Sequence, residues 1–504
     1  MHEHTVRATT TAGIVEGFTR DGVHRWRSIP YARPPVGRLR FRAPEPAHPW
    51  RGVRYCHSFA SCAPQHRRYT MLGVGKYQSV SEDCLTINVV APADHEPGSE
   101  PLPVMFFIHG GGYIMGSSAT PIYDGVSLAR RGCVYVSANY RLGPLGCLDM
   151  SSLATPDIPI DSNLFLRDLV LALEWVRDNI AAFGGDPDNV TIFGESAGAH
   201  AVSTLLAVPQ AEGLFARAIA ESPASGMVSD AKVAAEAAER FANILGVSRP
   251  HAAQALIAAR PIDLVKALDA LLASSMDNMS GAFAVGPTRG DEFLPHDPVH
   301  AMKHGAAHDV PLIVGTNADE GRLFTRFLKL LPTNESAIEQ LLAYVDSETR
   351  ERITSAYPGY PRADACIQLG GDFAFGSAAW QIAEAHGRHA PTYVYRYDYA
   401  PRTLHWSGLG ATHGTELLAV FGIYRTKFGS ALTAAMDRAS ALRVSREMQG
   451  RWLDFSRTGI PSEDWPAYTH AERPVMVFDR NTRIEFDPHP HRRKAWEGFS
   501  LAAR

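Results

Sequence analysis

Residues 189–207 read NVTIFGESAGAHAVSTLLA, and this stretch indicates the fold of the chain. It begins with a short apolar run that predicts a buried strand, and it ends in small and apolar residues that predict a helix. Between the two, GESAG (194–198) matches the pattern GxSxG. A serine on so sharp a turn has strained backbone angles, and the glycines on either side let the neighbouring chain pass closely. The sequence therefore predicts that the Ser196 hydroxyl is exposed as a nucleophile.

The segments around this stretch alternate between strand and helix patterns, which indicates a sheet covered by helices. Strands are predicted at 103–108, 133–138, 189–193, 310–316 and 392–399. A helix is predicted over 164–182, with Asp161 or Ser162 as its N-cap and Gly184 as its end. No repeat or long linker divides the chain, so a single domain over residues 1–504 is expected. The expected fold class is α/β, with a mostly parallel central sheet, helices on both faces and large helical insertions.

Composition and charge argue against several classes of protein. A formal charge of -4 and a pI near 6.6 give no basic field for nucleic acid. Apolar runs such as 104–108 are too short to span a membrane, and the N-terminus lacks the pattern of a secretory signal. The basic cluster HPHRRK (489–494) is predicted to be a solvated tail. The six cysteines show no paired zinc spacing, so we expect no metal, reduced thiols and a cytoplasmic location.

A serine hydroxyl needs a base to take its proton, and histidine titrates in the useful range. In proteins with this serine turn, an acid and then a histidine follow on loops after later strands. Asp319 and Glu320 follow one predicted strand, and His405 and His413 follow another. His413 lies in GATHG, whose small residues leave room for the imidazole, whereas His405 lies beside a leucine and a tryptophan, as a packing residue would. The residues alone favour His413 and leave Asp319 and Glu320 unresolved.

HGGG (109–112) follows the predicted strand at 103–108. Glycines in such a loop let backbone N–H groups approach a negatively charged oxygen closely. A phosphate-binding loop is the competing interpretation, but it would need a lysine and a Ser or Thr that are missing here. We therefore expect an oxyanion-binding loop, and no cofactor.

These motifs and others resemble the type-B carboxylesterase family, which includes cholinesterases and bacterial para-nitrobenzyl esterases. The segments that carry the resemblance are GESAG, HGGGY (109–113), IPYARPPVGRLRF (29–41), SEDCLTINV (81–89), NYRLGPLG (139–146), FGGDPDNVTIFG (183–194), GLFARAIAES (213–222), TNADEG (316–321) and WLDFSRTGIP (452–461). They extend over nearly the full chain in the family's order. The resemblance implies the α/β-hydrolase fold and a serine carboxylesterase that uses no cofactor.

The resemblance also implies a role for individual residues. Ser196 aligns with the nucleophile, His413 with the base and Glu320, rather than Asp319, with the acid of a catalytic triad. The family's oxyanion hole corresponds to Gly111, Gly112 and the amide of Ala197. Residues implied to support the triad are Glu195, Ser222 and Glu416.

The substrate expected from these residues is a neutral ester of short to medium chain length. Cys62 and Cys84 fall where the family has its N-terminal disulfide, and whether they pair is left open. Cholinesterases hold quaternary ammonium on a tryptophan in that loop, but none lies between these cysteines. Two alternatives are a non-catalytic, cholinesterase-like interaction protein and a lipase acting at interfaces. We expect a monomer or a weak homo-oligomer.

Overall fold

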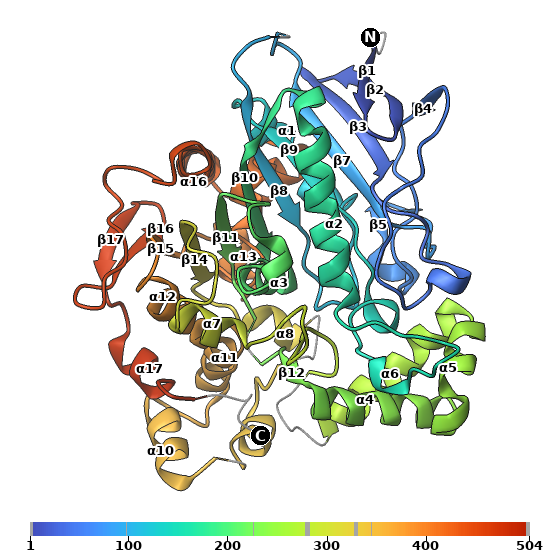
Figure 1. Cartoon of the computed structure of the whole chain (residues 1–504). Coiled ribbons are helices and arrows are strands. Elements are labelled where there is room, and N and C mark those ends of the chain that lie inside the picture. The colour runs from blue at the N-terminus through green and yellow to red at the C-terminus, as the bar shows by residue number, and fades with distance from the viewer. Residues whose placement is uncertain are drawn as a thin grey trace.

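A sheet of 13 strands forms the centre of the computed structural model, which describes residues 4–96, 98–224, 226–277, 283–326, 331–343 and 345–499 (Figure 1). From one edge to the other its strands are β1 (His4–Thr10), β2 (Gly13–Arg20), β3 (Val23–Pro30), β7 (Thr86–Pro92), β9 (Val134–Ala138), β8 (Leu102–Ile108), β10 (Gly185–Glu195), β11 (Arg217–Glu221), β14 (Leu312–Asn317), β15 (Thr392–Tyr397), β16 (Pro474–Phe478) and β17 (Arg483–Phe486), with β4 (Val53–Tyr55) beside β2. Two small pairs are β5 (Met71–Gly73) with β6 (Lys76–Tyr77), and β12 (Ser229–Asp230) with β13 (Thr288–Arg289).

The central strands, from β9 to β16, run parallel. The outer pairs are antiparallel, except that β4 runs parallel to β2. A parallel strand that is covered on both faces is apolar throughout, as β8 is. Alternate residues of β8 enter different cores: Val104, Phe106 and Ile108 face one layer. Met105 and Phe107 face the other. The expected mostly parallel sheet with two covered faces is confirmed.

Helices cover both faces of the sheet. Helices α2, α3 and α12 contribute to one core, and α1, α14 and α16 to the other; Figure 1 shows α2 crossing in front of the sheet and α4 to α6 grouped below it, as the predicted helical insertions. The helices are α1 (Val126–Ala129), α2 (Leu164–Asn179), α3 (Ala197–Leu205), α4 (Ala231–Ile244), α5 (Arg249–Ala258), α6 (Pro261–Asp277), α7 (Pro298–Lys303), α8 (Arg322–Arg326), α9 (Glu335–Leu342), α10 (Ser347–Ser355), α11 (Ala363–Gly371), α12 (Ser377–His386), α13 (Arg402–Trp406), α14 (Leu417–Val420), α15 (Lys427–Leu432), α16 (Arg438–Thr458) and α17 (Pro490–Ala495).

The five predicted strands correspond to β8, β9, β10, β14 and β15, and the predicted helix over 164–182 corresponds to α2. The predicted N-cap of that helix is wrong: the cap residue is Asn163, at φ 53°. Asp161 instead accepts hydrogen bonds from Arg42 and from the amide of Ala43. Ser162 donates to Asp291. Both predicted caps are therefore engaged by other segments.

The predicted solvated tail at 489–494 is also wrong, because most of it forms helix α17, which is bound to the rest of the protein. Arg492 lies 2.6 Å from Asp372, and Arg493 lies 2.9 Å from Asp487. The side chain of Arg493 is only 9% exposed. Ion pairs with Asp372 and Asp487 hold this segment, and its composition gives no sign of those partners.

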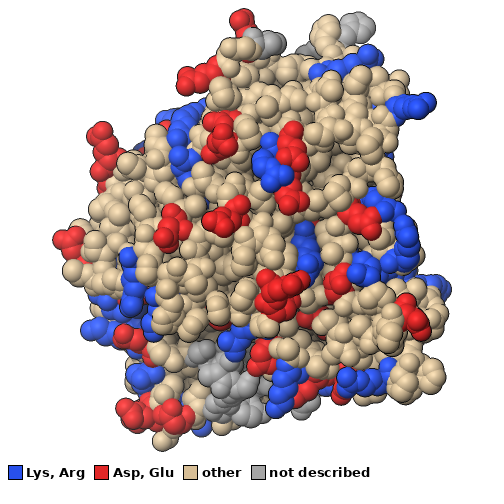
Figure 2. Space-filling view, viewed as in Figure 1, with Lys and Arg blue, Asp and Glu red and all other residues tan. Residues whose placement is uncertain are grey.

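All six cysteines are free and buried. Burial raises the pKa of the Cys62 thiol to about 11, which favours the protonated, unreactive form. None of the helices in the described ranges has the length and apolar character needed to cross a membrane. Figure 2 shows acidic and basic side chains interspersed over the visible face. The single domain over residues 1–504 stays a prediction.

Candidate active site

Ser196 occupies a strained turn between β10 and α3. Its backbone has φ 59° and ψ -125°, a conformation that a residue with a side chain adopts only when its surroundings impose it. A Cβ at Gly194 would lie 2.6 Å from the carbonyl oxygen of Ile108, and one at Gly198 would lie 2.1 Å from it. The glycines therefore let the turn press against the end of β8, as the sequence predicts.

The glycine loop after β8 lies beside this turn. A Cβ at Gly110 would lie 3.0 Å from the Ser196 side chain. Gly111 has φ 115° and Gly112 φ 60°, and a Cβ at Gly111 would lie 2.1 Å from the carbonyl oxygen of Met115. The N–H groups of Gly111, Gly112 and Ala197 donate to no other residue that the structure describes. Such unpaired N–H groups, one of them at the start of a helix, can stabilise a negatively charged oxygen.

Glu320 and His413 are in direct contact. Nδ1 of His413 lies 2.6 Å from Oε2 of Glu320. The other carboxylate oxygen accepts hydrogen bonds from the Ser222 hydroxyl at 2.6 Å and from the Asn317 amide at 2.7 Å. These bonds hold the carboxylate in place, so Glu320 can orient the imidazole and leave Nε2 available.

The alternative candidates for the acid and the base, Asp319 and His405, have different surroundings. Asp319 pairs with Arg322 at 2.9 Å. His405 lies on the short helix α13 and is exposed to solvent, with Trp406 75% exposed beside it. The structure therefore brings His413 together with Glu320 and keeps Asp319 and His405 apart from it. The expectation that His405 is a packing residue is wrong, because only Leu404 of that helix packs against the core cluster.

His413 is enclosed by aromatic and acidic neighbours. The ring of Phe375 stacks on the imidazole with centroids 4.1 Å apart, and Phe324 lies at 5.3 Å. Nε2 lies 3.1 Å from Oε1 of Glu195 but has no hydrogen-bond partner. Burial alone would lower the pKa of His413, but the carboxylates of Glu195 and Glu320 raise it above its ordinary value. A bond from a serine to such a histidine commonly tightens only when substrate binds.

Three further glutamates are buried around the histidine. Burial raises the pKa of Glu195 to about 7 and that of Glu221, its partner on the adjacent strand, to about 8. It also raises the pKa of Glu416 well above its ordinary value. Glu416 accepts a hydrogen bond from the Asn317 side chain at 2.6 Å and has no bond to His413. Its link to the imidazole therefore runs through Asn317 and Glu320.

Sequence reasoning missed several residues that contact this cluster. Asn317 lies within TNADEG, and Glu221 lies directly before Ser222 in GLFARAIAES. The motifs therefore contained both residues but gave no reason to single them out. Trp452 donates its indole N–H to Glu221 at 2.7 Å. Phe375 comes from a π-helical turn, Asp372–Gly376, and no motif marks it. Within the described ranges, no three His, Cys, Asp or Glu side chains are arranged to hold a metal ion.

Glu221→Gln is expected to reduce the loss of stability at alkaline pH. The ordinary pKa of a glutamate is 4.5, and that of folded Glu221 is about 8, so the folded state holds the proton more tightly. This contribution to stability is complete below about pH 4.5 and is lost as pH rises through about 8. Between pH 6 and pH 9 the free energy of unfolding should fall by ~3 kcal/mol more in the parent protein than in the variant.

Urea unfolding at the two pH values measures this difference, and Glu212→Gln, at an exposed position, is the control. Glutamine can still accept the Trp452 hydrogen bond, so the variant keeps that contact. Equal pH dependence of the parent protein and Glu221→Gln would show that Glu221 is ionised when folded.

The sheet and the strained serine between β10 and α3 define an α/β-hydrolase fold. A family model described as the carboxylesterase family matches residues 3–496. The para-nitrobenzyl esterase of Bacillus subtilis is 38% identical over 96% of this chain and 97% of its own. The fumonisin B1 esterase of Sphingopyxis macrogoltabida is 35% identical over 93% and 85%. A solved PNB esterase structure superimposes with a TM-score of 0.86 at 37% identity, covering 97% of this chain and 99% of that one.

The chain belongs to the carboxylesterase family. It is a carboxylic ester hydrolase of the serine carboxylesterase class.

Proposed function

We propose that Ser196 attacks the carbonyl carbon of an ester while His413 takes the serine proton through Nε2. The N–H groups of Gly111, Gly112 and Ala197 bind the resulting oxyanion. His413 then gives the proton to the leaving alcohol, and an acyl-serine remains. Water, activated by the same histidine, releases the acid and restores the serine.

The contact that carries this proposal is the 2.6 Å bond from Nδ1 of His413 to Glu320, together with the unpartnered Nε2. With Nδ1 bound to a carboxylate, the neutral ring carries its proton there and presents a lone pair at Nε2. Glu320 also stabilises the imidazolium that forms once the ring takes the serine proton. Ser222 and Asn317 act by holding Glu320 in position.

A fluorophosphonate probe tests the assignment of the nucleophile. The probe reacts covalently with an activated serine, and peptide mass spectrometry then locates the adduct. The adduct is expected on the peptide that contains Ser196, and heat-unfolded protein is the control. An adduct on another serine, or none at all, would contradict the proposal.

We also propose that the preferred substrates are neutral esters of short to medium chain length. The two tyrosines between Cys62 and Cys84 are each covered by an arginine. The guanidinium of Arg67 lies 4.6 Å from the ring centroid of Tyr77, and that of Arg68 lies 4.7 Å from Tyr69. A guanidinium therefore already occupies one face of each ring, where a quaternary ammonium group could otherwise bind.

A neutral alkyl butyrate is therefore expected to have a kcat/KM at least about tenfold higher than butyrylcholine. A trimethylammonium group loses hydration on binding and gains little from Glu195, whose pKa of about 7 leaves it only partly ionised at neutral pH. Using butyrate in both substrates isolates the alcohol side. The measurement is initial rates by pH-stat titration at matched ionic strength. A higher kcat/KM for butyrylcholine would require another aromatic surface at the site.

A further inference from the structure

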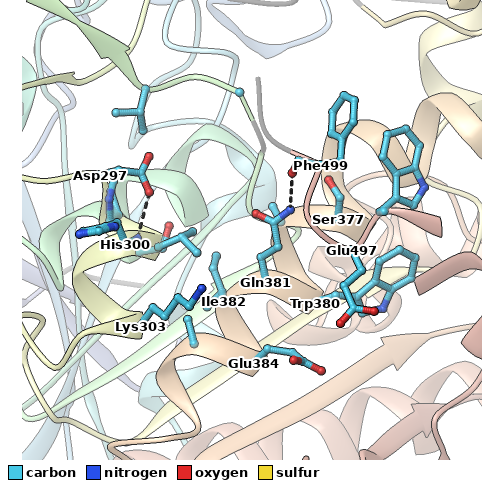
Figure 3. Close-up of a pocket in the computed structure, with 18 of the residues that line it drawn as sticks. Asp297, His300, Lys303, Ser377, Trp380, Gln381, Ile382, Glu384, Glu497 and Phe499 are labelled. Atoms are coloured by element: carbon cyan, nitrogen blue, oxygen red, sulfur yellow. Dashed lines mark hydrogen bonds between the residues drawn. The ribbon is translucent and has the colours of Figure 1, made fainter. Parts of the chain in front are cut away.

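A cavity of about 520 Å³ lies between α3, α7 and α12. Figure 3 shows His300 and Lys303 of α7 on one side and Gln381 and Glu384 of α12 on the other. The charged lining residues are Lys303, Arg388, Arg493, Asp297, Glu384 and Glu497. Three cations and three carboxylates give the lining no overall sign, which suits a neutral ligand better than an ionic one.

The inner wall of this cavity follows the helix that begins at the proposed nucleophile. His200 and Ser203 of α3 line the cavity. They lie four and seven residues after Ser196, so the three residues share one face of the helix. At 1.5 Å per residue, His200 lies roughly 6 Å along the axis from the serine and Ser203 roughly 10 Å. The cavity therefore leads away from Ser196 along α3.

Two other residues that line the cavity lie only two positions along the sequence from residues of the candidate active site. Ala224 lies two residues after Ser222, which binds Glu320. Ser377 lies two residues after Phe375, which stacks on the imidazole of His413. Three separate segments of the chain thus run from the site into the wall of the cavity.

His200 presents a hydrogen-bond donor at this wall. Its Nδ1 lies 2.8 Å from the hydroxyl of Tyr113, which is fully buried and has no other hydrogen bond to a described residue. A buried hydroxyl with one partner donates its hydrogen to it, so Nδ1 is the acceptor. Burial lowers the pKa of His200 to about 4, so the ring is neutral at neutral pH. Its proton is therefore on Nε2, which has no bond to a described residue.

The wall hydroxyls, by contrast, are already used. Ser203 donates to the carbonyl oxygen of His200 at 2.9 Å, and Ser377 donates to that of Phe373 at 2.9 Å. Gln381 donates to the carbonyl oxygen of Phe499 at 3.1 Å, as Figure 3 shows. His200 is thus the wall residue nearest Ser196 along α3 that retains an unused donor.

We propose that this cavity receives the acyl chain of the substrate, and that Nε2–H of His200 binds an oxygen carried by that chain roughly one helical turn from the ester carbonyl. The inference rests on the proposed function, because it requires the acyl group to be held on Ser196. The alcohol leaves beside His413, whereas the acyl chain stays bonded to the serine at the start of α3. Esters of acids with an ether, ketone or hydroxyl oxygen at that distance are the substrate class.

Nitrophenyl 4-methoxybutanoate and nitrophenyl hexanoate form the test pair, because they differ only by an oxygen in place of one methylene. The quantity measured is the ratio of their kcat/KM values, in which general damage to catalysis cancels. His200→Leu in a Tyr113→Phe background leaves no orphaned hydroxyl and removes the donor. The ratio is expected to fall about tenfold relative to the parent protein, in which the Tyr113 hydroxyl holds the proton on Nε2.

Two further variants test whether the donor itself is responsible. His200→Gln supplies a side-chain N–H, so its ratio should stay within about threefold of the parent value. A change of about threefold is a smaller free-energy difference than the loss of one hydrogen bond. Ser203→Ala removes a hydroxyl that already bonds the backbone, so its ratio should change less than about twofold. An equal fall in Ser203→Ala would mean that the cavity responds to any change of shape, and would overturn the assignment to His200.

An unchanged ratio in His200→Leu/Tyr113→Phe would overturn the inference. The inference would also be overturned if the variant changed the kcat/KM ratio only when the ether oxygen lies in the alcohol. The acetates of pentan-1-ol and 3-methoxypropan-1-ol measure that ratio. The proposed function has separate readouts, which are hydrolysis of nitrophenyl acetate by the parent protein and phosphonate labelling of Ser196. If both are present and the ratio does not move, only the inference fails; if both are absent, the proposed function fails and the inference with it.

Discussion

Ser196→Ala is expected to lower kcat for nitrophenyl acetate by roughly 10⁴- to 10⁶-fold and to abolish the burst of nitrophenol. Without the hydroxyl no acyl-serine forms, and only the oxyanion donors remain to assist attack by water. The protein should still fold, because alanine keeps the Cβ and the Ser196 hydroxyl makes no hydrogen bond to a described residue. Stopped-flow absorbance measures the burst, and circular dichroism measures thermal unfolding.

Ser222→Ala is the control, since Ser222 also has a positive φ, of 56°, and is buried, whereas Ser196 is partly exposed. It is expected to keep the burst and the phosphonate adduct, with kcat lowered about tenfold through loss of its bond to Glu320. A burst that survives in Ser196→Ala but disappears in Ser222→Ala would move the nucleophile to the second serine.

His413→Ala should lose a comparable amount, roughly 10⁴- to 10⁶-fold in kcat, because the serine proton then has no acceptor. The parallel change His405→Ala removes an exposed imidazole and should alter kcat less than twofold, like other surface substitutions. Initial rates at pH 8 on nitrophenyl acetate give both values.

Glu320→Ala and Asp319→Ala extend the comparison to the acid. The first should lower kcat by about 10⁴-fold, since the imidazole loses its orientation and tautomer. The second breaks a partly exposed ion pair with Arg322 and should lower kcat by less than about threefold. A larger loss in Asp319→Ala than in Glu320→Ala, or in His405→Ala than in His413→Ala, would reverse the assignment.

The central strands and the serine turn were predictable because their signals are local. A buried parallel strand is a continuous apolar run. GESAG predicts a turn because a side chain at either of its glycines would clash with the neighbouring backbone. The choice between Asp319 and Glu320 was not predictable from local chemistry, because both are acidic residues on the same loop. The two residues differ in their spatial partners: Ser222 and Asn317 bind Glu320, whereas Asp319 pairs with Arg322.

The features that were mispredicted depend on partners far along the chain. Asp161 is a good N-cap by composition, but Arg42 occupies its carboxylate. Arg492 is part of a basic run, yet it is held by Asp372 from another helix. Phe375 could not be assigned to the site, since an apolar residue in a helix carries no sign of what it will stack against.

Phe375 reaches His413 from a π-helical turn, and this has an evolutionary consequence. Such a turn holds one residue more than an α-helical turn, and it joins α11 to α12 without a break. Deleting a single residue here would restore α-helical geometry and leave the flanking turns in register, but it would shift the residues of the turn itself and carry the Phe375 ring off the imidazole. Point substitutions can vary the stacked side chain freely, but insertions and deletions cannot accumulate in this segment without changing the histidine's surroundings. Among divergent sequences with the same triad, helix length should therefore vary less here than amino-acid identity.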